Sequence, residues 1–448
     1  MLGRRLEYHS QKTVLLHMDA NVRFKISLHM PSIRSVEKVV PLKMDELLLT
    51  DVVTSVNDSF YDVGVDRRFP YGSATEEVLH YESNLDYDEF GFPFVSGHNV
   101  LLPGDVSFRQ ENDKVRFDTE EDEREYRQGL RCCEKALKKL NELESKGVTK
   151  NDLLRSLENV PIESEEDREV RDILRMDSDN IAEYIKGYKQ ELQAFACRRN
   201  NSKSQFDSYI KLSIFKEGAR EVKFRFEYTK KLFEASKYLN EIFFGGRTMP
   251  IRVRKLSLCG DSILRLPVGF QLHVQSLPTI GDNGLTHKSL PLIVGNLANL
   301  DCLNVYSDDL RLDGYKSQIV RNAKKLIIEK GVMENDVIVR VIRDLPNREI
   351  GIRTRKSMFS HEFYITVLQN WLDGGRKVGA CLWMETGRIG TGQNMADEVL
   401  KWIEARYDKS ERNERCVTVP LSNSTVMEVG SVPFEDSSWM LKLNILKI

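Results

Sequence analysis

The chain has 448 residues, of which 41% are hydrophobic and 30% charged, an ordinary composition for a soluble protein of two or three domains. Its formal net charge of −2 provides no overall positive field, so we expect neither nucleic acid nor a membrane as a partner. The seven cysteines form no C-x-x-C pair, and no apolar run approaches the ~18 to 20 residues of a membrane span. These features predict a cytoplasmic or nuclear protein with reduced thiols and no metal or cofactor.

Residues 1–43 form the first unit, which we predict to contain short helices. Val14, Leu15 and Met18 fall at helical spacing, whereas the run from Val22 to Leu28 alternates and fits either a helix or a strand. Charged residues interrupt the N-terminal stretch, so we expect no secretory signal.

Residues 44–120 are predicted to be a region of strands and loops. The apolar runs at 46–53 and 59–65 have the composition of strands, and a polar, aromatic and glycine-containing stretch follows them.

Residues 121–199 change in composition to a charged helical arm. Two apolar stripes at helical spacing run along it, made of Tyr126, Leu130, Cys133, Leu137 and Leu140 in the first and of Ile181, Tyr184, Ile185, Tyr188, Leu192 and Phe195 in the second. One hypothesis is a seam for a partner or a second copy of the chain. The alternative, that the two stripes bury each other, is favoured because an amphipathic helix must bury its stripe somewhere.

The last unit, residues 206–448, begins with the clearest hairpin signal of the chain. Alternating apolar residues at 210–214 and 222–228 flank a turn at Glu217-Gly218. Basic residues alternate with aromatic ones on the second strand, a pattern that also occurs in nucleic-acid-binding strands. Because the aromatic side chains share one face, we expect them to pack in the core instead. A helix capped by Thr229 should follow and end at Gly245-Gly246.

The segment from Ile251 to Ile328 contains units of the form L-x-x-L-x-L. The last two aliphatic residues of each unit lie two positions apart, as in strands with one buried face, and the first lies three positions upstream. The units are Val253, Leu256 and Leu258, then Leu300, Leu303 and Val305, then Ala323, Leu326 and Ile328. The layout is typical of leucine-rich-type units, whose strands stack in parallel. The spacing is irregular, so we predict an irregular leucine-rich-repeat-like βα solenoid in an α+β or α/β fold.

The remaining elements continue this alternation. We predict strands at 336–342, 349–354, 377–384, 416–420 and 439–447, a helix capped by Ser360, and a helix over 394–407 that begins at Asn394.

No motif in the chain indicates catalysis. Gly387, Gly390 and Gly392 form a glycine-rich loop, but their spacing differs from the dinucleotide fingerprint and better fits a tight turn between a strand and a helix. His361-Glu362 lacks the second histidine of a zinc protease motif. His273 should face solvent from a strand, between Leu272 and Val274. We therefore predict a protein that is not an enzyme and has no catalytic, cofactor-binding or metal-binding residues.

Three stretches resemble a nematode-expanded family of unknown function that includes F-box C proteins. They are Pro31 to Lys43, Asp207 to Arg247, and IRVRKLSL with LRLPVGFQLHV, and the hairpin YIKLSI followed by FGGR is the most specific part. The resemblance covers most of residues 8–350. It implies an F-box-associated type of recognition domain and makes residues 1–43 a degenerate F-box-like segment, in which Tyr8-His9-Ser10 replaces the usual Leu-Pro.

Residues and resemblance together predict a non-enzymatic intracellular protein-binding module, which could serve as a substrate receptor of a cullin-type ubiquitin ligase. The candidate residues for binding the F-box adaptor are Val14, Leu15, Met18 and Phe24. The alternatives are a structural protein that self-associates through the helical arm and, third, an orphan enzyme.

Overall fold

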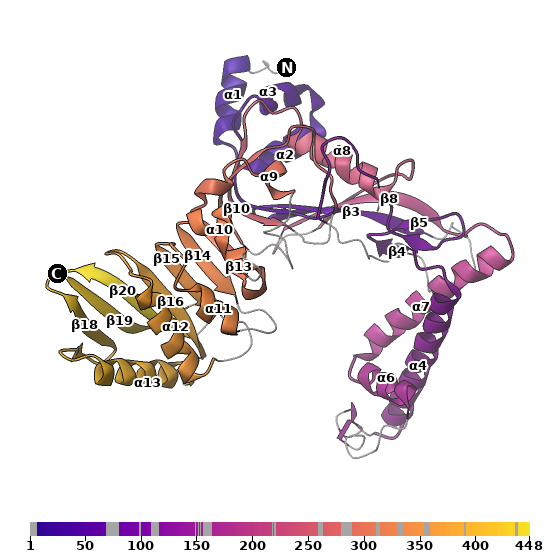
Figure 1. Ribbon diagram of the computed structural model, residues 1–448. Coiled ribbons are helices and arrows are strands. Elements are labelled where there is room, and N and C mark those ends of the chain that lie inside the picture. Colours follow the sequence, from indigo (N-terminus) through magenta and orange to yellow (C-terminus); the bar gives the residue numbers. More distant parts are fainter. Residues whose placement is uncertain are drawn as a thin grey trace.

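The architecture is that of a computed structural model, a mixed α/β fold organised around one large sheet (Figure 1). The structure describes residues 7–68, 80–97, 100–108, 116–147, 149–150, 152, 154–155, 164–216, 218, 221–258, 263–278, 289–310, 314–329, 335–353, 359–388, 391–434 and 438–448.

The large sheet contains sixteen strands in the described part of the chain. Their order across the sheet is β17-β18-β19-β20-β16-β15-β14-β13-β12-β10-β1-β2-β3-β8-β9, and β4 pairs with β3 beside this path. In chain order the strands are β1 (Lys43–Leu49), β2 (Val53–Val56), β3 (Ser59–Arg68), β4 (His80–Ser83), β8 (Asp207–Lys216), β9 (Val222–Glu227), β10 (Ile251–Leu258), β12 (Leu272–Leu277), β13 (Cys302–Tyr306), β14 (Lys325–Glu329), β15 (Glu349–Arg353), β16 (Cys381–Arg388), β17 (Glu411–Arg412), β18 (Cys416–Ser422), β19 (Thr425–Phe434) and β20 (Ser438–Lys447). Two small ribbons, β5 (Asp86–Tyr87) with β6 (Pro93–Phe94) and β7 (Val106–Ser107) with β11 (Ile263–Leu264), lie apart from it.

The centre of the sheet is a run of seven parallel strands, from β1 through β10, β12, β13, β14 and β15 to β16, which we call the parallel section. Strands β13 and β14, which contain two of the L-x-x-L-x-L units, pair in register, so that Leu303 lies beside Leu326 and Val305 beside Ile328. The unit on β10 is separated from them by β12. All nine aliphatic residues named for the L-x-x-L-x-L units are buried. The period-two pattern therefore marks one buried face shared by consecutive strands.

Antiparallel strands flank the parallel section on both sides. β20 pairs antiparallel with β16 at one end, and β2 pairs antiparallel with β1 at the other. The result is a mixed sheet, and a leucine-rich-repeat solenoid is not confirmed.

Helices cover one face of the sheet. They are α8 (Leu232–Phe244), α9 (Leu290–Ile293), α10 (Gln318–Asn322), α11 (Asn335–Val341), α12 (His361–Asp373) and α13 (Thr391–Arg406), with short 3-10 turns η3 (Leu297–Asn299), η4 (Ser307–Leu310) and η5 (Gly314–Lys316). Figure 1 shows α10 to α13 lined up along the same side of the strands β13 to β20. Their buried apolar residues join those of the strands in one continuous core. On β10 and β12 the residues that alternate with the buried ones are exposed, so no helix among the described residues covers the opposite face there.

Three short helices, α1 (Tyr8–His17), α2 (Ala20–His29) and α3 (Arg34–Lys38), precede the sheet, with η1 (Pro31–Ile33) before α3. The sequence of Val22 to Leu28 fits either a helix or a strand, and in the structure this run lies in helix α2. Phe24 of α2 is stacked on Phe243 of α8 at 4.4 Å between ring centroids, and it belongs to the core of the large sheet.

A buried ionic cluster also joins these helices to α8. Glu37 lies between two arginines, with its Oε1 at 2.7 Å from Nη2 of Arg23 and 2.7 Å from Nη2 of Arg247. Arg23 donates further hydrogen bonds to the carbonyl oxygens of Val40 and Pro41. Because two buried arginines depend on a single carboxylate, loss of Glu37 would leave both charges uncompensated.

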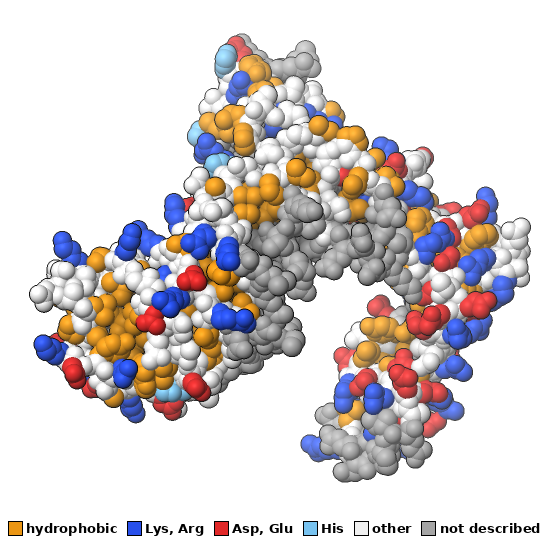
Figure 2. Space-filling model, viewed as in Figure 1, with side chains coloured by type: hydrophobic (Ala, Val, Ile, Leu, Met, Phe, Trp, Pro, Cys, Tyr) orange, Lys and Arg blue, Asp and Glu red, His pale blue; other side chains and the backbone are white. Residues whose placement is uncertain are grey.

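The helical arm consists of α4 (Glu120–Ser145), α6 (Glu165–Ile173) and α7 (Ser178–Arg199) and projects away from the sheet (Figure 1). Its apolar stripes pack against each other in a separate core of Cys132, Cys133, Ala136, Leu140, Ile173, Leu174 and Ile181. At its base, Phe195 packs edge-on against Phe92 of the strand and loop region. Figure 2 shows acidic and basic side chains interspersed along the surface of the arm.

Several predicted elements differ from the structure. Residues 336–342 were expected as a strand but lie mostly in helix α11, because Val337, Ile338, Val341 and Ile342 share one helical face that is buried in the core. The stretch 46–53 is divided between β1 and β2, since the backbone turns where Thr50 bonds to Val53.

Helix starts were predicted with mixed success. Ser360 caps α12 through the N–H of Phe363, as expected. Thr229 does not cap α8, which begins after Lys231, where the Glu234 carboxylate accepts a hydrogen bond from the Lys231 N–H. Asn394 lies inside α13 instead of at its start. The strand expected at 377–384 begins at Cys381, because the chain turns at Gly379, whose φ is +86°.

Candidate functional site

The face of the parallel section that points away from the core is the candidate functional site, and we call it the open face. Residues between the buried aliphatic ones point toward it. On β10 and β12 these are Arg252, Arg254, His273 and Gln275, all exposed. The predicted solvent exposure of His273 is thus confirmed. A sheet with one buried and one uncovered face can present a broad binding surface built on rigid strands.

Ion pairs between neighbouring strands neutralise much of the open face. Lys325 of β14 lies 2.6 Å from Glu349 of β15, and Lys255 of β10 lies 3.1 Å from Glu46 of β1. A further pair joins Asp301 and Lys324 at 2.7 Å. Exposed pairs like these stabilise the fold by at most ~1 kcal/mol each, but they set opposite charges side by side, the arrangement that sheets favour.

An aromatic platform lies on the open face near β16. Trp383 is directly beside Gly351 of β15, where an added Cβ would come within 2.0 Å of the indole ring. The indole N–H donates to Oε1 of Glu349 at 3.1 Å, and the ring lies 5.3 Å from that of Phe434. Glycine at position 351 therefore lets the tryptophan lie flat on the sheet.

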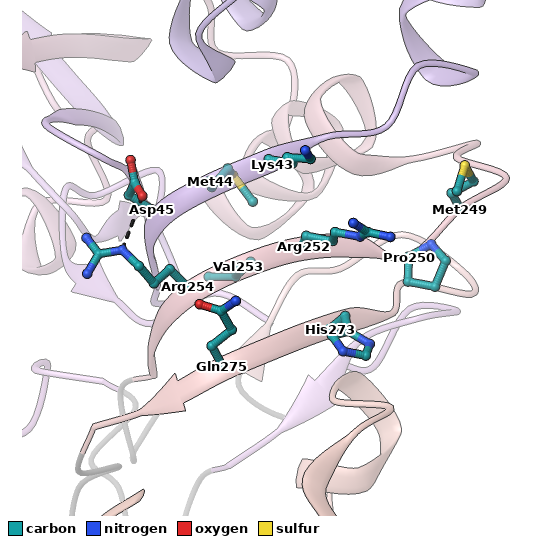
Figure 3. Close-up of a pocket in the computed structure, with 10 residues that line it drawn as sticks. All are labelled: Lys43, Met44, Asp45, Met249, Pro250, Arg252, Val253, Arg254, His273 and Gln275. Carbon is teal, nitrogen blue, oxygen red and sulfur yellow. Dashed lines mark hydrogen bonds and ion pairs between the residues drawn. The ribbon is translucent and has the colours of Figure 1, made fainter. Parts of the chain in front are cut away.

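A pocket of about 650 Å³ opens on the same face at β1, β10 and β12. Figure 3 shows Lys43, Arg252 and His273 side by side on these three strands, with Met249 and Pro250 at one end of the pocket. Strand pairing sets Lys43 opposite Arg252 and Arg252 opposite His273. We call these three residues the basic row.

The charges around the pocket are unevenly paired. Arg254 donates to Asp45 at 3.1 Å, the contact drawn as a dashed line in Figure 3. By contrast, no side chain of the basic row has a hydrogen bond or an ion pair with any residue that the structure describes. The pocket thus presents N–H donors that no acceptor of the described chain satisfies.

The four candidate adaptor-binding residues do not lie on one surface. Leu15 is buried in a small cluster with Val36 and Val40, and Met18 packs against that cluster. Phe24 is buried in the main core, whereas Val14 is 41% exposed. The helices bring Leu15 and Met18 together but place Phe24 elsewhere, and adaptor binding stays a prediction.

The hairpin of β8 and β9 departs from its expected role. Val222 and Phe226 were expected in the core but are 49% and 53% exposed, because β9 is the last strand of the sheet. Phe226 and Tyr238 border an apolar groove of about 240 Å³ between β8, β9 and α8. On the other face, Lys223 donates to Glu82 at 2.7 Å, so this lysine is paired within the chain.

Two groups with shifted pKa values lie where the units of the molecule meet. Burial, reinforced by the nearby Arg247 guanidinium, lowers the pKa of Lys38 to about 8, and its ammonium group donates to the carbonyl oxygens of Glu241 and Ile242. Burial raises the pKa of Glu191, on α7, to about 7, although Arg67 opposes the shift. Burial is the main cause of both shifts, which explains them without catalysis.

Three structural findings bear on the expectations from the sequence. The described residues contain no group of three or more His, Cys, Asp and Glu side chains placed to hold a metal ion. Gly387 is the second-to-last residue of β16 and Gly392 the second residue of α13, whereas Gly390 lies outside the described residues. A search of the helices among the described residues finds none long and apolar enough to cross a membrane.

Sequence reasoning noticed His273 but missed the basic row. Lys43 lies some 200 positions before Arg252, and only the parallel pairing of β1 with β10 sets them side by side. One feature of the sequence could have indicated part of this row. Arg252 and Arg254 alternate with the apolar Ile251 and Val253, a pattern that predicts a strand with a basic, solvent-exposed face.

Comparison with known families finds one match. Residues 231–388 match the model of a domain of unknown function, DUF3557. The match begins at α8 and ends with β16, so it contains most of the parallel section and two residues of the basic row, Arg252 and His273. No curated protein and no solved structure matches the chain.

Proposed function

We propose that the protein is a non-enzymatic intracellular binding module that holds a protein partner on its open face. The observation that carries this proposal is the arrangement of the parallel section, whose seven strands bury one face, whereas on β10 and β12 the opposite face is exposed and no helix of the described residues covers it. In this proposal the section serves as a leucine-rich-repeat-like scaffold, and the exposed side chains of β10 and β12 make the contacts. Rigid strands lower the entropic cost of presenting such side chains to a partner.

Photo-crosslinking tests this proposal directly. A photoreactive amino acid placed at Gln275, on the open face, should give a small set of discrete and saturable protein adducts in cells. The matched control is Tyr184, which is 52% exposed on the arm. Equal adduct patterns from both positions, or none from Gln275, would contradict a partner on the open face.

We further propose that the N-terminal helices act as an F-box-like segment, which would make the protein a substrate receptor of a cullin-type ubiquitin ligase. Support comes from the three helices over residues 8–38 and from apolar side chains that they leave outside, Val14, Leu16 and Val22 at 41%, 50% and 46% exposure. Adaptors are bound through a few apolar anchors of this kind. Among the four predicted adaptor-binding residues, Val14 can contact an adaptor directly, whereas Leu15 and Phe24 would support the helices from within.

Two aspartate substitutions separate contact from folding. Val14→Asp should abolish co-purification with the adaptor and shift the melting temperature by less than about 2 °C, because the position is exposed. Leu15→Asp should lower the melting temperature strongly, since it buries an unpaired charge. Val268→Asp, at 70% exposure elsewhere, is the control that should retain the adaptor. Absence of adaptor from the wild-type preparation would rule out the ligase role and leave the open-face proposal untouched.

The alternative function, self-association through the helical arm, has less structural support than partner binding on the open face. Its apolar stripes already contact each other in the core around Cys133 and Leu140. The enzyme alternative lacks any supporting cluster among the described residues.

A further inference from the structure

The basic row is unlike the other cross-strand contacts of the open face. Elsewhere on this face, neighbouring strands set opposite charges together, as in Lys255 with Glu46 and Lys325 with Glu349. In the basic row, two cations and a histidine lie directly opposite one another, and like charges in that position destabilise a sheet. An arrangement that costs stability and lines a pocket is characteristic of a binding site.

We propose that the basic row binds the phosphate group of a phosphorylated segment in the partner protein. This inference rests on the proposed function, because it specifies the chemistry of the partner on the open face. Each member of the row supplies N–H donors: an ammonium from Lys43, a guanidinium from Arg252 and a ring N–H from His273. No carboxylate lies in the row to compete for these donors.

The size and charge of the site fit phosphate better than a carboxylate. Three strands about 4.8 Å apart spread the row over roughly 10 Å, and side chains of this length can converge on one anion between them. A phosphorylated serine or threonine carries a charge of about −1.5 to −2 and three acceptor oxygens, so it can use donors from all three strands. A carboxylate has a single charge and two oxygens, and it would leave part of the row unsatisfied.

The surroundings fit a peptide better than a nucleic acid. Asp45, paired with Arg254, lies at one side of the row, and Met249 and Pro250 lie at its end. A polynucleotide backbone needs a longer basic track, because its affinity grows with each phosphate that is contacted. On the remainder of the open face, positive and negative side chains lie next to each other. The apolar side chains of Met249 and Pro250 at the end of the pocket can contact peptide residues that flank a single phosphate group.

The experiment uses the full chain and two immobilised peptide libraries. One library carries phosphothreonine at the centre of an otherwise degenerate sequence, and the other carries threonine. We expect the wild-type chain to bind the phosphorylated library at least tenfold better, and Arg252→Gln and Lys43→Gln to reduce this ratio to near one. Arg254→Gln is the matched control on the same strand and in the same pocket. It should keep the preference, because the Arg254 charge is already paired with Asp45.

A stability measurement accompanies the binding assay. Arg252→Gln should leave the melting temperature unchanged or raise it, since it relieves repulsion within the row. A lower melting temperature would mean that the arginine stabilises the fold and would overturn the inference. Equal binding to both libraries would also overturn it, as would equal binding to a glutamate library or effective competition by an RNA oligonucleotide. Should phosphate selectivity fail while adducts at Gln275 persist, the inference falls and the proposed function stands.

Discussion

In the parallel section, the strands bury most of their aliphatic residues on the face that the helices cover, whereas in the arm the helices α4 and α7 bury theirs against each other. The sheet shares its core with helices that follow several of its strands in the sequence, as β14 is followed by α11 and β15 by α12. The arm completes its core locally and touches the body at its base. The difference explains why the sheet keeps exposed side chains such as Arg252 and His273 on its second face, while ion pairs link exposed side chains of the arm.

The substitutions with the largest expected effect on the free energy of unfolding test whether the sheet and the arm unfold separately. Leu303→Ala removes a fully buried side chain from the main core and should lower the free energy of unfolding of the sheet by ~2 to 5 kcal/mol. Leu140→Ala should weaken the arm alone, because Leu140 belongs to the separate core. Hydrogen exchange measured by mass spectrometry can locate each loss of protection. Faster exchange throughout the sheet in Leu140→Ala would show that the arm and the sheet form one cooperative unit.

A second substitution tests the junction between the two regions. Glu191 on α7 has its pKa raised by burial from the ordinary value of 4.5 to about 7. The folded state therefore holds this proton more tightly than the unfolded state, and its stabilising contribution is lost as the pH rises from about 4.5 through about 7. Glu191→Gln should remove this dependence and be more stable than the wild type by ~3 kcal/mol at pH 8, with no difference near pH 4.

Denaturant unfolding at a series of pH values measures this difference. Glu183→Gln, an exposed position on the same helix, is the control and should follow the wild type at every pH. A constant difference between Glu191→Gln and wild type across the pH range would contradict titration of this carboxyl group in the folded arm.

The smallest expected effect concerns the open face itself. Gly351→Ala places a methyl group where the Trp383 ring lies and should cost ~1 to 2 kcal/mol, because the ring must move. Gly430→Ala is the control, since its added Cβ would meet nothing closer than 3.8 Å. The loss should shrink when Trp383→Leu is combined with Gly351→Ala, a coupling that a double-mutant cycle can measure. Equal effects of the two alanine substitutions would show that the tryptophan does not rest on Gly351.

The sequence predicted strands best where aliphatic residues alternate with period two and all lie on one buried face. Leu303 and Val305 alternate, and so do Leu326 and Ile328, and these pairs form neighbouring parallel strands. The pattern misled at residues 336–342, where β-branched residues indicated a strand. A parallel sheet needs a crossover between β14 and β15, and helix α11 supplies it there. Strand β19 was not predicted, because Gly430 and Pro433 interrupt its alternation.

The candidate site was predictable only in part. Exposed His273 followed from its position between Leu272 and Val274 in an apolar alternation. The basic row did not, because it depends on which strands become neighbours, and that order is decided by packing of the whole chain. Pairing of β1 with β10 joins segments separated by the entire arm. Such long-range pairing leaves no local trace in the sequence.

The two outermost strands of the sheet affect how the molecule behaves at high concentration. At one end lies β17, which has only two residues, Glu411 and Arg412, and at the other lies β9, with Lys223 and Arg225 among its six residues. A long sheet whose border strands were flat and apolar would add further copies of itself by backbone hydrogen bonding and grow into fibres. A two-residue border and a charged border both oppose this growth. So large a sheet can therefore end at these two borders without adding the edge strands of further copies.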